Sequence, residues 1–246
     1  MRAQDEKIKG FNLLELLVVV VLIGIVSGLA YPNFKKWRTD REVRDAVFKI
    51  KSLIEGINAQ VQRGQYVFVQ VKVEDGELEN NNQGLIITSK GMSSAEFAPL
   101  LNNNESNWWT DIPNRCNITE PDYWTDDPEV DGNDSIEVRQ LIFENVSTAW
   151  AGDIGAVCFG KNERWFNGNS RLVSGTGDNA VVDNFLFICE RKIDAPQCNI
   201  INGVPSASHS NLFAIEWSRF GNISVDKWKP SDPTGENPAL GDWVRQ

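Results

Sequence analysis

An almost unbroken apolar run near the start of the chain constrains its fold more than any other feature. The run extends from Leu13 to about Tyr31 and carries one charged side chain, Glu15. About 20 apolar residues in a helix are enough to cross the hydrocarbon core of a bilayer. A charge at that depth costs roughly 2.5–3.5 kcal/mol, so such a residue is expected to be functional. The sequence therefore predicts a helix surrounded by lipid or by other helices, with Glu15 paired to a cation.

A short basic segment precedes this run and ends in Gly10-Phe11. A cut between Gly10 and Phe11 would place the new α-amino group one helical turn from Glu15 of the same chain or of a neighbour. Lys7, Lys9, Gly10, Phe11 and Glu15, followed by Pro32 where the run stops, resemble the prepilin signal of type IV pilins and type II secretion pseudopilins.

This resemblance implies that residues 1–10 are a leader, removed by a prepilin peptidase that also methylates the amine of Phe11. It implies that residues 11–32 cross the membrane and later form the filament core, with Glu15 and Pro32 as assembly residues. The expected partners are other pilin or pseudopilin subunits, the peptidase and an inner-membrane assembly platform.

Two simpler interpretations of the same segment are a secretory signal peptide and an ordinary membrane anchor. Gly28-Leu29-Ala30 would serve as a signal-peptide cleavage site, and the run is long enough for an anchor. Neither interpretation accounts for Glu15 within the apolar region, and an anchor does not account for the Gly-Phe junction.

Residues 33–64 are expected to continue the helix with an amphipathic pattern. Apolar residues recur at intervals of three and four and fall on one stripe, namely Val43, Val47, Ile50, Ile54, Ile57 and Val61. Gly64 is a natural helix end. Gly24, Gly28 and Pro32 make 22–32 the place where the helix is expected to kink or melt.

Residues 65–246 are expected to form a β-rich head, giving an α+β pilin fold with the long helix packed on an antiparallel sheet. Asp75-Gly76 is expected to be a turn after the first strand, and 218–221 a hairpin connection. Residues 91–133 have little periodicity and are expected to be an inserted loop. The expected strands are 66–73, 84–89, 138–144, 154–159, 181–189, 212–217 and 222–228.

The head is similar in layout to the minor pseudopilin H and FimT minor-pilin group. The similarity rests on Arg63-Gly64 at the helix end followed by a Val-rich strand, and on Arg219-Phe220-Gly221 between two late strands. A head of this size favours a minor or specialised subunit. The predicted location is the bacterial inner membrane with the head in the periplasm, and later an extracellular or periplasmic filament. A pilus and a type II secretion pseudopilus both remain open.

Charge is distributed unevenly along the chain. Residues 31–63 carry eight basic and four acidic side chains, which suggests a partner-facing basic surface. Residues 64–246 carry 13 basic and 27 acidic side chains, a net charge of −14. Nucleic-acid binding depends on basic side chains that neutralise phosphates, so a nucleic-acid partner is not expected.

All four cysteines lie in the head, and an even number in an exported chain favours disulfides. Three connectivities are possible. The nine-residue interval between Cys189 and Cys198 suggests a local bridge, which would leave Cys116 to pair with Cys158. No Cys-x-x-Cys pair is present, so a zinc site is not expected.

An acidic segment offers a possible calcium site, with Asp127, Glu129, Asp131, Asn133 and Glu137 as ligands. Its terminal glutamate falls one position short of the EF-hand spacing, and a solvated acidic loop is the simpler interpretation.

Four tryptophans, Trp108, Trp109, Trp124 and Trp150, allow a sugar-binding surface on a filament-tip adhesin, although large aromatic residues more often fill a core. The only histidine is His209, and no nucleophile or phosphate-binding motif is present, so no enzymatic activity and no cofactor are expected.

Overall fold

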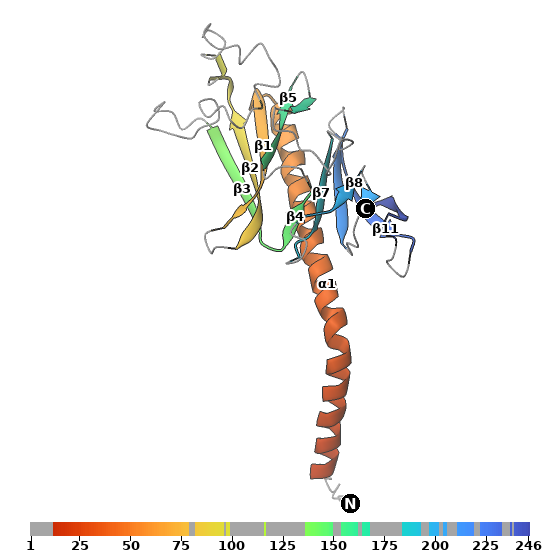
Figure 1. Ribbon diagram of the computed structural model, residues 1–246. Helices are drawn as coiled ribbons and strands as arrows, with labels where there is room; N and C mark the ends of the chain where they lie inside the picture. Colours follow the sequence, from red (N-terminus) through yellow and green to blue (C-terminus); the bar gives the residue numbers. More distant parts are fainter. Residues whose placement is uncertain are drawn as a thin grey trace, which may run out of the picture. The chain divides into compact units, whose positions relative to one another are not determined.

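The protein is described from a computed structural model (Figure 1). The residues that it describes are 12–78, 82–95, 97–98, 116, 136–149, 154–161, 164–167, 184–192, 197–201, 204–205, 211–218, 222–232, 237 and 239–246. The chain divides into two compact units, residues 1–41 and residues 42–246, and each is described by itself.

One long helix, α1, runs from Leu13 to Gln62. Asn12 caps its start, because the Leu14 backbone N–H donates to Oδ1 of Asn12 at 3.2 Å. The helix was predicted to kink or melt between residues 22 and 32; melting is wrong, since α1 is helical throughout that range, and the kink stays a prediction. A single proline removes only one backbone donor from a helix, and the turns on both sides can hold it together.

The end of α1 confirms the prediction that Gly64 stops the helix. Gly64 has a φ of 77°, which glycine adopts without steric cost. Its N–H donates to the Val61 carbonyl at 3.0 Å, and the Gln65 N–H donates to the Gln60 carbonyl at 3.1 Å. These two bonds form a Schellman motif, which satisfies carbonyls left free at the helix end.

The strands form two five-stranded antiparallel sheets and one short pair. The first sheet has the order β3-β2-β1-β5-β6, with β1 Phe68–Glu77, β2 Gln83–Met92, β3 Ile136–Phe143, β5 Ile154–Gly160 and β6 Arg164–Asn167. The second has the order β12-β11-β10-β7-β4, with β4 Val146–Thr148, β7 Phe185–Glu190, β10 Leu212–Trp217, β11 Ile223–Pro230 and β12 Gly241–Arg245. Strands β8 Ile200–Ile201 and β9 Val204–Pro205 pair with each other.

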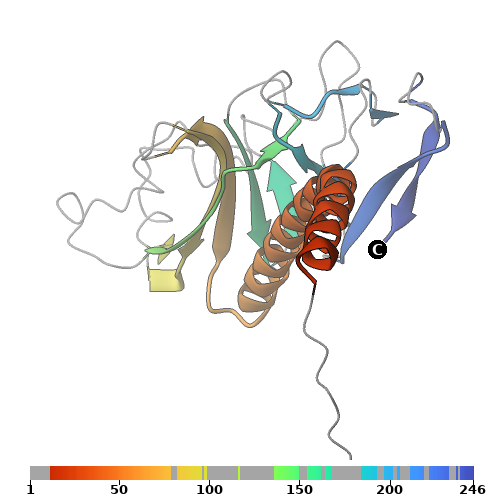
Figure 2. The ribbon, with the colours of Figure 1, turned by 90° about the horizontal axis from the view of Figure 1, so that it is seen from below.

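The two sheets and the part of α1 from residue 42 onward share one hydrophobic core. In Figures 1 and 2 the sheets lie on either side of this part of the helix. The predicted apolar stripe of α1 is buried there, as are alternate residues of the central strands, including Val69, Val71, Val73, Ile188, Phe213, Ile215 and Trp217. The α+β arrangement of a long helix packed on antiparallel sheets is therefore confirmed.

The predicted turn at Asp75-Gly76 is wrong. Strand β1 continues to Glu77, and Gly76 pairs with Gly84 of β2 in the ladder. A Cβ added at Gly84 would come within 2.7 Å of the Leu78 side chain, so Leu78 occupies the space that the missing side chain leaves. The connection to β2 follows instead, where the Leu78 N–H donates to the Asn82 carbonyl at 2.7 Å.

The other predicted strands correspond to β1, β2, β3, β5, β7, β10 and β11, with small differences at their ends. The antiparallel pairing of β10 with β11 confirms the predicted hairpin. The predicted loop at 91–133 is wrong at its start, since Gly91 and Met92 belong to β2, and most of the remainder lies outside the described residues. The alternation of apolar and polar residues did not predict β4, β6, β8, β9 and β12, because strands of two to five residues are too short to show a two-residue period.

Candidate assembly surface

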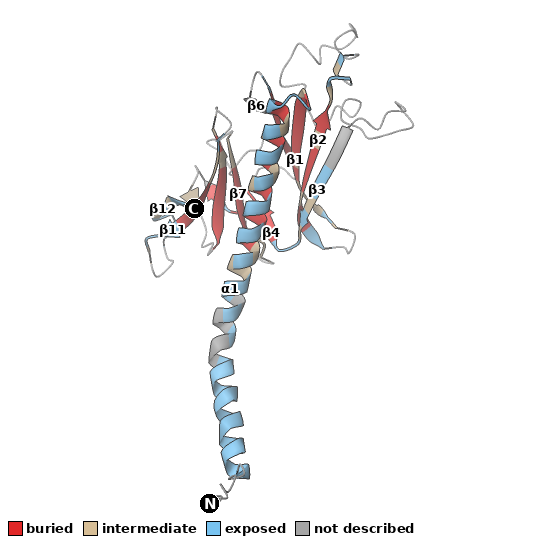
Figure 3. Ribbon diagram, turned by 180° about the vertical axis from the view of Figure 1, so that it is seen from behind, coloured by how far each residue is buried: buried red, intermediate tan, exposed pale blue. Residues whose placement is uncertain are grey.

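The N-terminal part of α1 exposes an almost continuous apolar surface. Figure 3 shows this part of the helix as exposed along its length. Its large apolar side chains between Leu13 and Val26 are between 46% and 81% exposed. A helix that is apolar on all sides is expected to be surrounded by other apolar material. The surface therefore defines a candidate assembly site.

Glu15 lies in the first turn of α1, three residues after the capping residue Asn12. The side chain is exposed, and it forms no ion pair or hydrogen bond with any residue that the structure describes. A carboxylate near a helix N-terminus is favoured by the helix dipole. Gly10 and Phe11 lie outside the described residues, so the predicted pairing of Glu15 with the Phe11 amine stays a prediction.

The sequence analysis did not predict Asn12 as the N-terminal capping residue of α1, although the sequence contains a capping pattern. An asparagine followed three residues later by a glutamate, just before an apolar run, is typical of a helix N-terminus. Pro32, the other predicted assembly residue, lies within α1, and the structure describes its backbone only.

Three exposed aromatic residues follow the apolar surface, still within residues 1–41. Tyr31, Phe34 and Trp37 are 71%, 61% and 55% exposed. The rings of Phe34 and Trp37 lie 5.8 Å apart, and the guanidinium of Arg41 lies 5.6 Å from the centre of the Trp37 ring. Exposed tryptophan, tyrosine and arginine are the residue types enriched at the energetic centres of interfaces.

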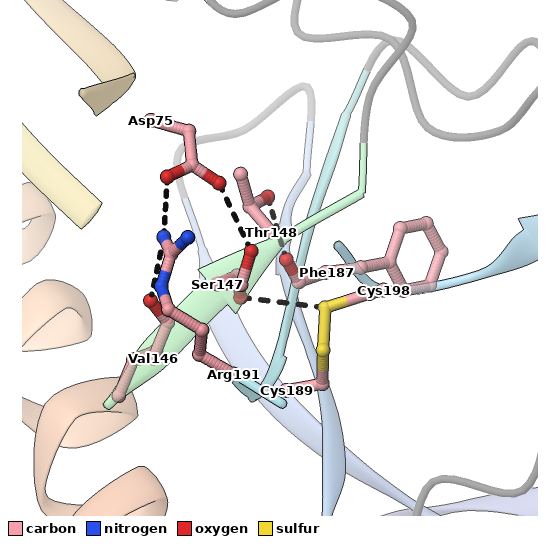
Figure 4. Close-up of a disulfide and its surroundings, with 8 residues drawn as sticks. All are labelled: Asp75, Val146, Ser147, Thr148, Phe187, Cys189, Arg191 and Cys198. Carbon is pink, nitrogen blue, oxygen red and sulfur yellow. Dashed lines mark hydrogen bonds and ion pairs between the residues drawn. A yellow bond between two sulfur atoms is a disulfide. The ribbon is translucent and has the colours of Figure 1, made fainter. Parts of the chain in front are cut away.

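The two disulfides join Cys116 to Cys158 and Cys189 to Cys198, the pairing that the short interval favoured. Each lies in a small apolar cluster separate from the shared core, one beside Phe68 and Met92 and the other beside Trp228. Figure 4 shows the second disulfide with its neighbours, where Sγ of Cys198 lies 3.3 Å from the Ser147 carbonyl oxygen. The disulfides therefore stabilise two buried clusters of the head that are separate from the shared core.

The predicted calcium ligands Asp127, Glu129, Asp131 and Asn133 lie outside the described residues. Glu137 lies on β3, where its backbone is opposite Gly91. Among the residues that the structure describes, no group of three His, Cys, Asp or Glu side chains could hold a metal ion. The calcium site stays a prediction.

The proposed ligand-binding tryptophans Trp108, Trp109, Trp124 and Trp150 also lie outside the described residues, as does His209. Two tryptophans that are described, Trp217 and Trp228, are buried in the head. A pocket between α1 and the first sheet, lined by Gly56, Gln60 and Arg139, has a cavity volume of about 70 Å³. Ligand pockets usually reach about 300–1,000 Å³, so this pocket does not fit a small-molecule site.

The late basic side chains of the head are engaged with neighbouring groups. Arg245 forms ion pairs with Asp226 at 2.8 Å and with Glu216 at 3.5 Å. The Lys227 ammonium lies 5.1 Å from the centre of the Phe213 ring. Among the described residues of this group, Lys229 is exposed, and Arg219 lies outside them. The arrangement offers few charges to a phosphate backbone.

Over the described part of the chain, no helix has both the length and the hydropathy that are needed to cross a membrane.

The fold is an α+β, pilin-like arrangement, and sequence comparison points in the same direction. The chain is similar to two fimbrial proteins of Pseudomonas aeruginosa, each 28% identical over 79 residues. The matched region covers 32% of this chain and 49% of each relative, so the chain spans about half the length of the curated relatives it matches. No protein-family model and no solved structure matches the chain.

Proposed function

We propose that the chain is a structural subunit of a type IV pilus-like filament. The observation that carries the proposal is the division of α1 into two parts with opposite surroundings. Its residues from Leu13 to Val26 are exposed and apolar, whereas its stripe from Val43 to Val61 is buried against two sheets. The similarity to fimbrial proteins supports the same function, and it favours a non-enzymatic protein.

In this proposal a prepilin peptidase cuts between Gly10 and Phe11 and methylates the Phe11 amine. The cut would leave the chain starting one residue before the capping residue Asn12, so the charged amine would lie beside the first turn of the helix. The carboxylate of Glu15 then neutralises that amine as the helix enters an apolar environment, where an unpaired charge is expensive.

Before assembly the subunit resides in the bacterial inner membrane with its head in the periplasm, where the two disulfides can form. An inner-membrane assembly platform then transfers it into the filament, where the apolar surface packs against other subunits. The size of the head favours a minor or specialised subunit.

The same subunit could serve a pilus or a type II secretion pseudopilus, and deletion of the gene distinguishes the two. Loss of surface filaments without loss of secreted enzymes identifies a pilus subunit. Loss of an exported enzyme from the medium identifies a pseudopilin.

Two measurements test the proposed function. Mass spectrometry of the processed protein is expected to find an N-terminus at Phe11, with a methyl group on the amine. An N-terminus at Tyr31 would identify a cleaved signal peptide instead.

Replacement of Glu15 tests the assembly mechanism. Glu15→Ala is expected to be exported and cut normally but to be absent from sheared filaments, and Glu15→Asp to be intermediate because its side chain is shorter. Glu77→Ala, at an exposed position at the end of β1, serves as the control and is expected to assemble normally. Normal incorporation of Glu15→Ala would rule the mechanism out.

A further inference from the structure

A short stretch of α1 directly after the apolar surface combines exposed aromatic rings with exposed basic side chains. We call this group the belt, and its members are Tyr31, Phe34, Lys36, Trp37 and Arg41. All five side chains are exposed. Residues 31–41 carry four basic side chains and one acidic side chain, a net charge of +3. The belt therefore offers both apolar area and positive charge to a partner.

The position of the belt along α1 matches the thickness of a lipid bilayer. At a rise of 1.5 Å per residue, Tyr31 lies about 27 Å and Trp37 about 36 Å from Leu13 along the helix axis. The hydrocarbon core of a bilayer is about 30 Å thick, and the headgroups bring the total to about 40–45 Å. If the apolar part of α1 crosses the membrane, the belt lies in the headgroup layer of the exported side.

The belt residues lie around α1 and not on one face. Successive residues of a helix are about 100° apart, so Lys36 lies about 160° from Phe34 and about 100° from Trp37 around the axis. A folded protein partner contacts one side of a helix, whereas lipid headgroups surround it. The distribution therefore favours lipid as the partner of the belt.

The side chain of Arg41 reaches back towards the apolar part of the helix. Its guanidinium lies 5.6 Å from the centre of the Trp37 ring, one turn nearer the N-terminus. Helical side chains tilt in this direction. Tryptophan and tyrosine are enriched at the headgroup level of membranes, and long basic side chains keep their charge there. The geometry thus places the charge of Arg41 beside an aromatic ring at that level.

An ordinary membrane anchor does not account for these basic side chains. Lysine and arginine are usually in excess on the cytoplasmic side of a span. Here residues 1–10 carry three basic and two acidic side chains, a net charge of +1, whereas residues 31–41 carry +3. In the proposed function the more positive flank lies on the exported side. Anionic phospholipids attract basic side chains near a bilayer surface and would compensate this charge.

We propose that Lys36 and Arg41 bind the phosphate groups of anionic phospholipids at the exported face of the membrane, with Tyr31, Phe34 and Trp37 in the surrounding headgroup layer. The inference rests on the proposed function, because it requires the apolar part of α1 to cross the bilayer. The belt then fixes how far the helix enters the membrane before assembly. Transfer of the subunit into a filament has to break these lipid contacts.

The lipid selectivity of the purified full-length chain tests the proposal. The chain is reconstituted in phosphatidylcholine bilayers with a trace of spin-labelled phosphatidylglycerol or of spin-labelled phosphatidylcholine. Electron paramagnetic resonance measures the fraction of each labelled lipid that is immobilised at the protein. We expect a preference of about threefold for phosphatidylglycerol at low salt, which decreases at high salt because charge contacts are screened.

Replacement of both basic side chains, Lys36→Gln with Arg41→Gln, is expected to remove this preference. The control is Lys161→Gln with Lys229→Gln, which removes the same charge from two exposed lysines of the head and should keep the preference. A preference that survives in the Lys36 and Arg41 variant would overturn the proposed site. An equal loss in the control would also overturn it, because net charge alone would then explain the selectivity.

The same variant distinguishes a lipid site from a contact with another subunit. If Lys36→Gln with Arg41→Gln is absent from sheared filaments while its preference for phosphatidylglycerol is unchanged, the two basic side chains serve a subunit contact and the proposal is wrong. Loss of the lipid preference supports the proposal whether or not assembly also decreases.

Flotation of the natural chain with phosphatidylcholine vesicles in alkaline carbonate separates this inference from the proposed function. A chain that floats with the vesicles but has no lipid preference refutes the lipid site and leaves the proposed function standing. A chain that carbonate removes from the vesicles contradicts both, because its apolar helix would not cross the bilayer.

Discussion

Asp75 of β1 and Arg191, the first residue after β7, form an ion pair that joins the two sheets (Figure 4). Their side chains are only 7% and 12% exposed. The second carboxylate oxygen of Asp75 accepts a hydrogen bond from Oγ of Ser147 on β4 at 3.0 Å. Arg191 also donates to the Val146 carbonyl at 3.3 Å. A nearly buried charge pair therefore fastens the first sheet to the edge of the second.

Arg191 lies within the loop that the Cys189–Cys198 disulfide closes, so the disulfide restrains the Arg191 side of the ion pair. The Cys198 backbone N–H donates to the Thr148 carbonyl at 3.0 Å, and Oγ1 of Thr148 donates to the Phe187 carbonyl at 2.7 Å. The disulfide, β4 and Arg191 thus form one connected group.

Removal of one charge from the buried pair is expected to destabilise the head strongly. Arg191→Met leaves Asp75 buried without its cation, and we expect the free energy of unfolding to fall by about 3 kcal/mol. Urea denaturation of the purified chain measures this loss. Lys72→Met is the control, because the Lys72–Glu74 pair is about 30% exposed and such pairs contribute less than about 1 kcal/mol. Equal losses in the two variants would contradict the structural role of the buried pair.

The disulfide and the ion pair are expected to be coupled. Replacement of both Cys189 and Cys198 by serine frees the loop that positions Arg191, so adding Arg191→Met should cost less than it does in the natural chain. A double-mutant cycle by urea denaturation measures this difference. Replacement of Cys116 and Cys158, which lie in a different cluster, should be additive with Arg191→Met. Additivity in both cycles would show that the loop does not position Arg191.

Two glycines of the helix region are expected to respond oppositely to alanine. Gly64→Ala places a side chain at a φ of 77° and should destabilise the chain by about 1 kcal/mol. Gly56→Ala lies within α1, where no atom lies within 4 Å of the added Cβ, and it should stabilise the isolated chain by about 0.5–1 kcal/mol. Thermal unfolding of the two variants provides the measurement, and a change of the same sign in both would contradict the assigned backbone roles.

The chain is expected not to bind duplex DNA at physiological salt. Lys227 contacts the ring of Phe213, and Arg245 forms an ion pair with Asp226. Nonspecific affinity for DNA grows with the number of phosphates that basic side chains neutralise, and these two side chains already have partners. A gel-shift titration at micromolar protein should show no complex. A salt-sensitive shift that Lys227→Ala and Lys229→Ala together abolish would overturn this expectation and favour a role in DNA uptake.

The sequence by itself determined the long helix, the stripe from Val43 to Val61, the end at Gly64 and most of the strands. These features depend on the spacing of apolar residues along one segment and on the conformational freedom of glycine, and both can be read from that segment alone. The exposed apolar run and Glu15 were also evident from the sequence, because they are properties of one stretch of chain.

The tertiary structure alone decided how the strands divide into two sheets and how those sheets are joined. Asp75 and Arg191 are 116 positions apart, and neither belongs to a local pattern. The prediction of a turn at Asp75-Gly76 was wrong because it considered only local preference. Pairing of Gly76 with Gly84 extends the strand through this dipeptide. Long-range pairing is selected by the packing of the whole head around α1, which no segment specifies by itself.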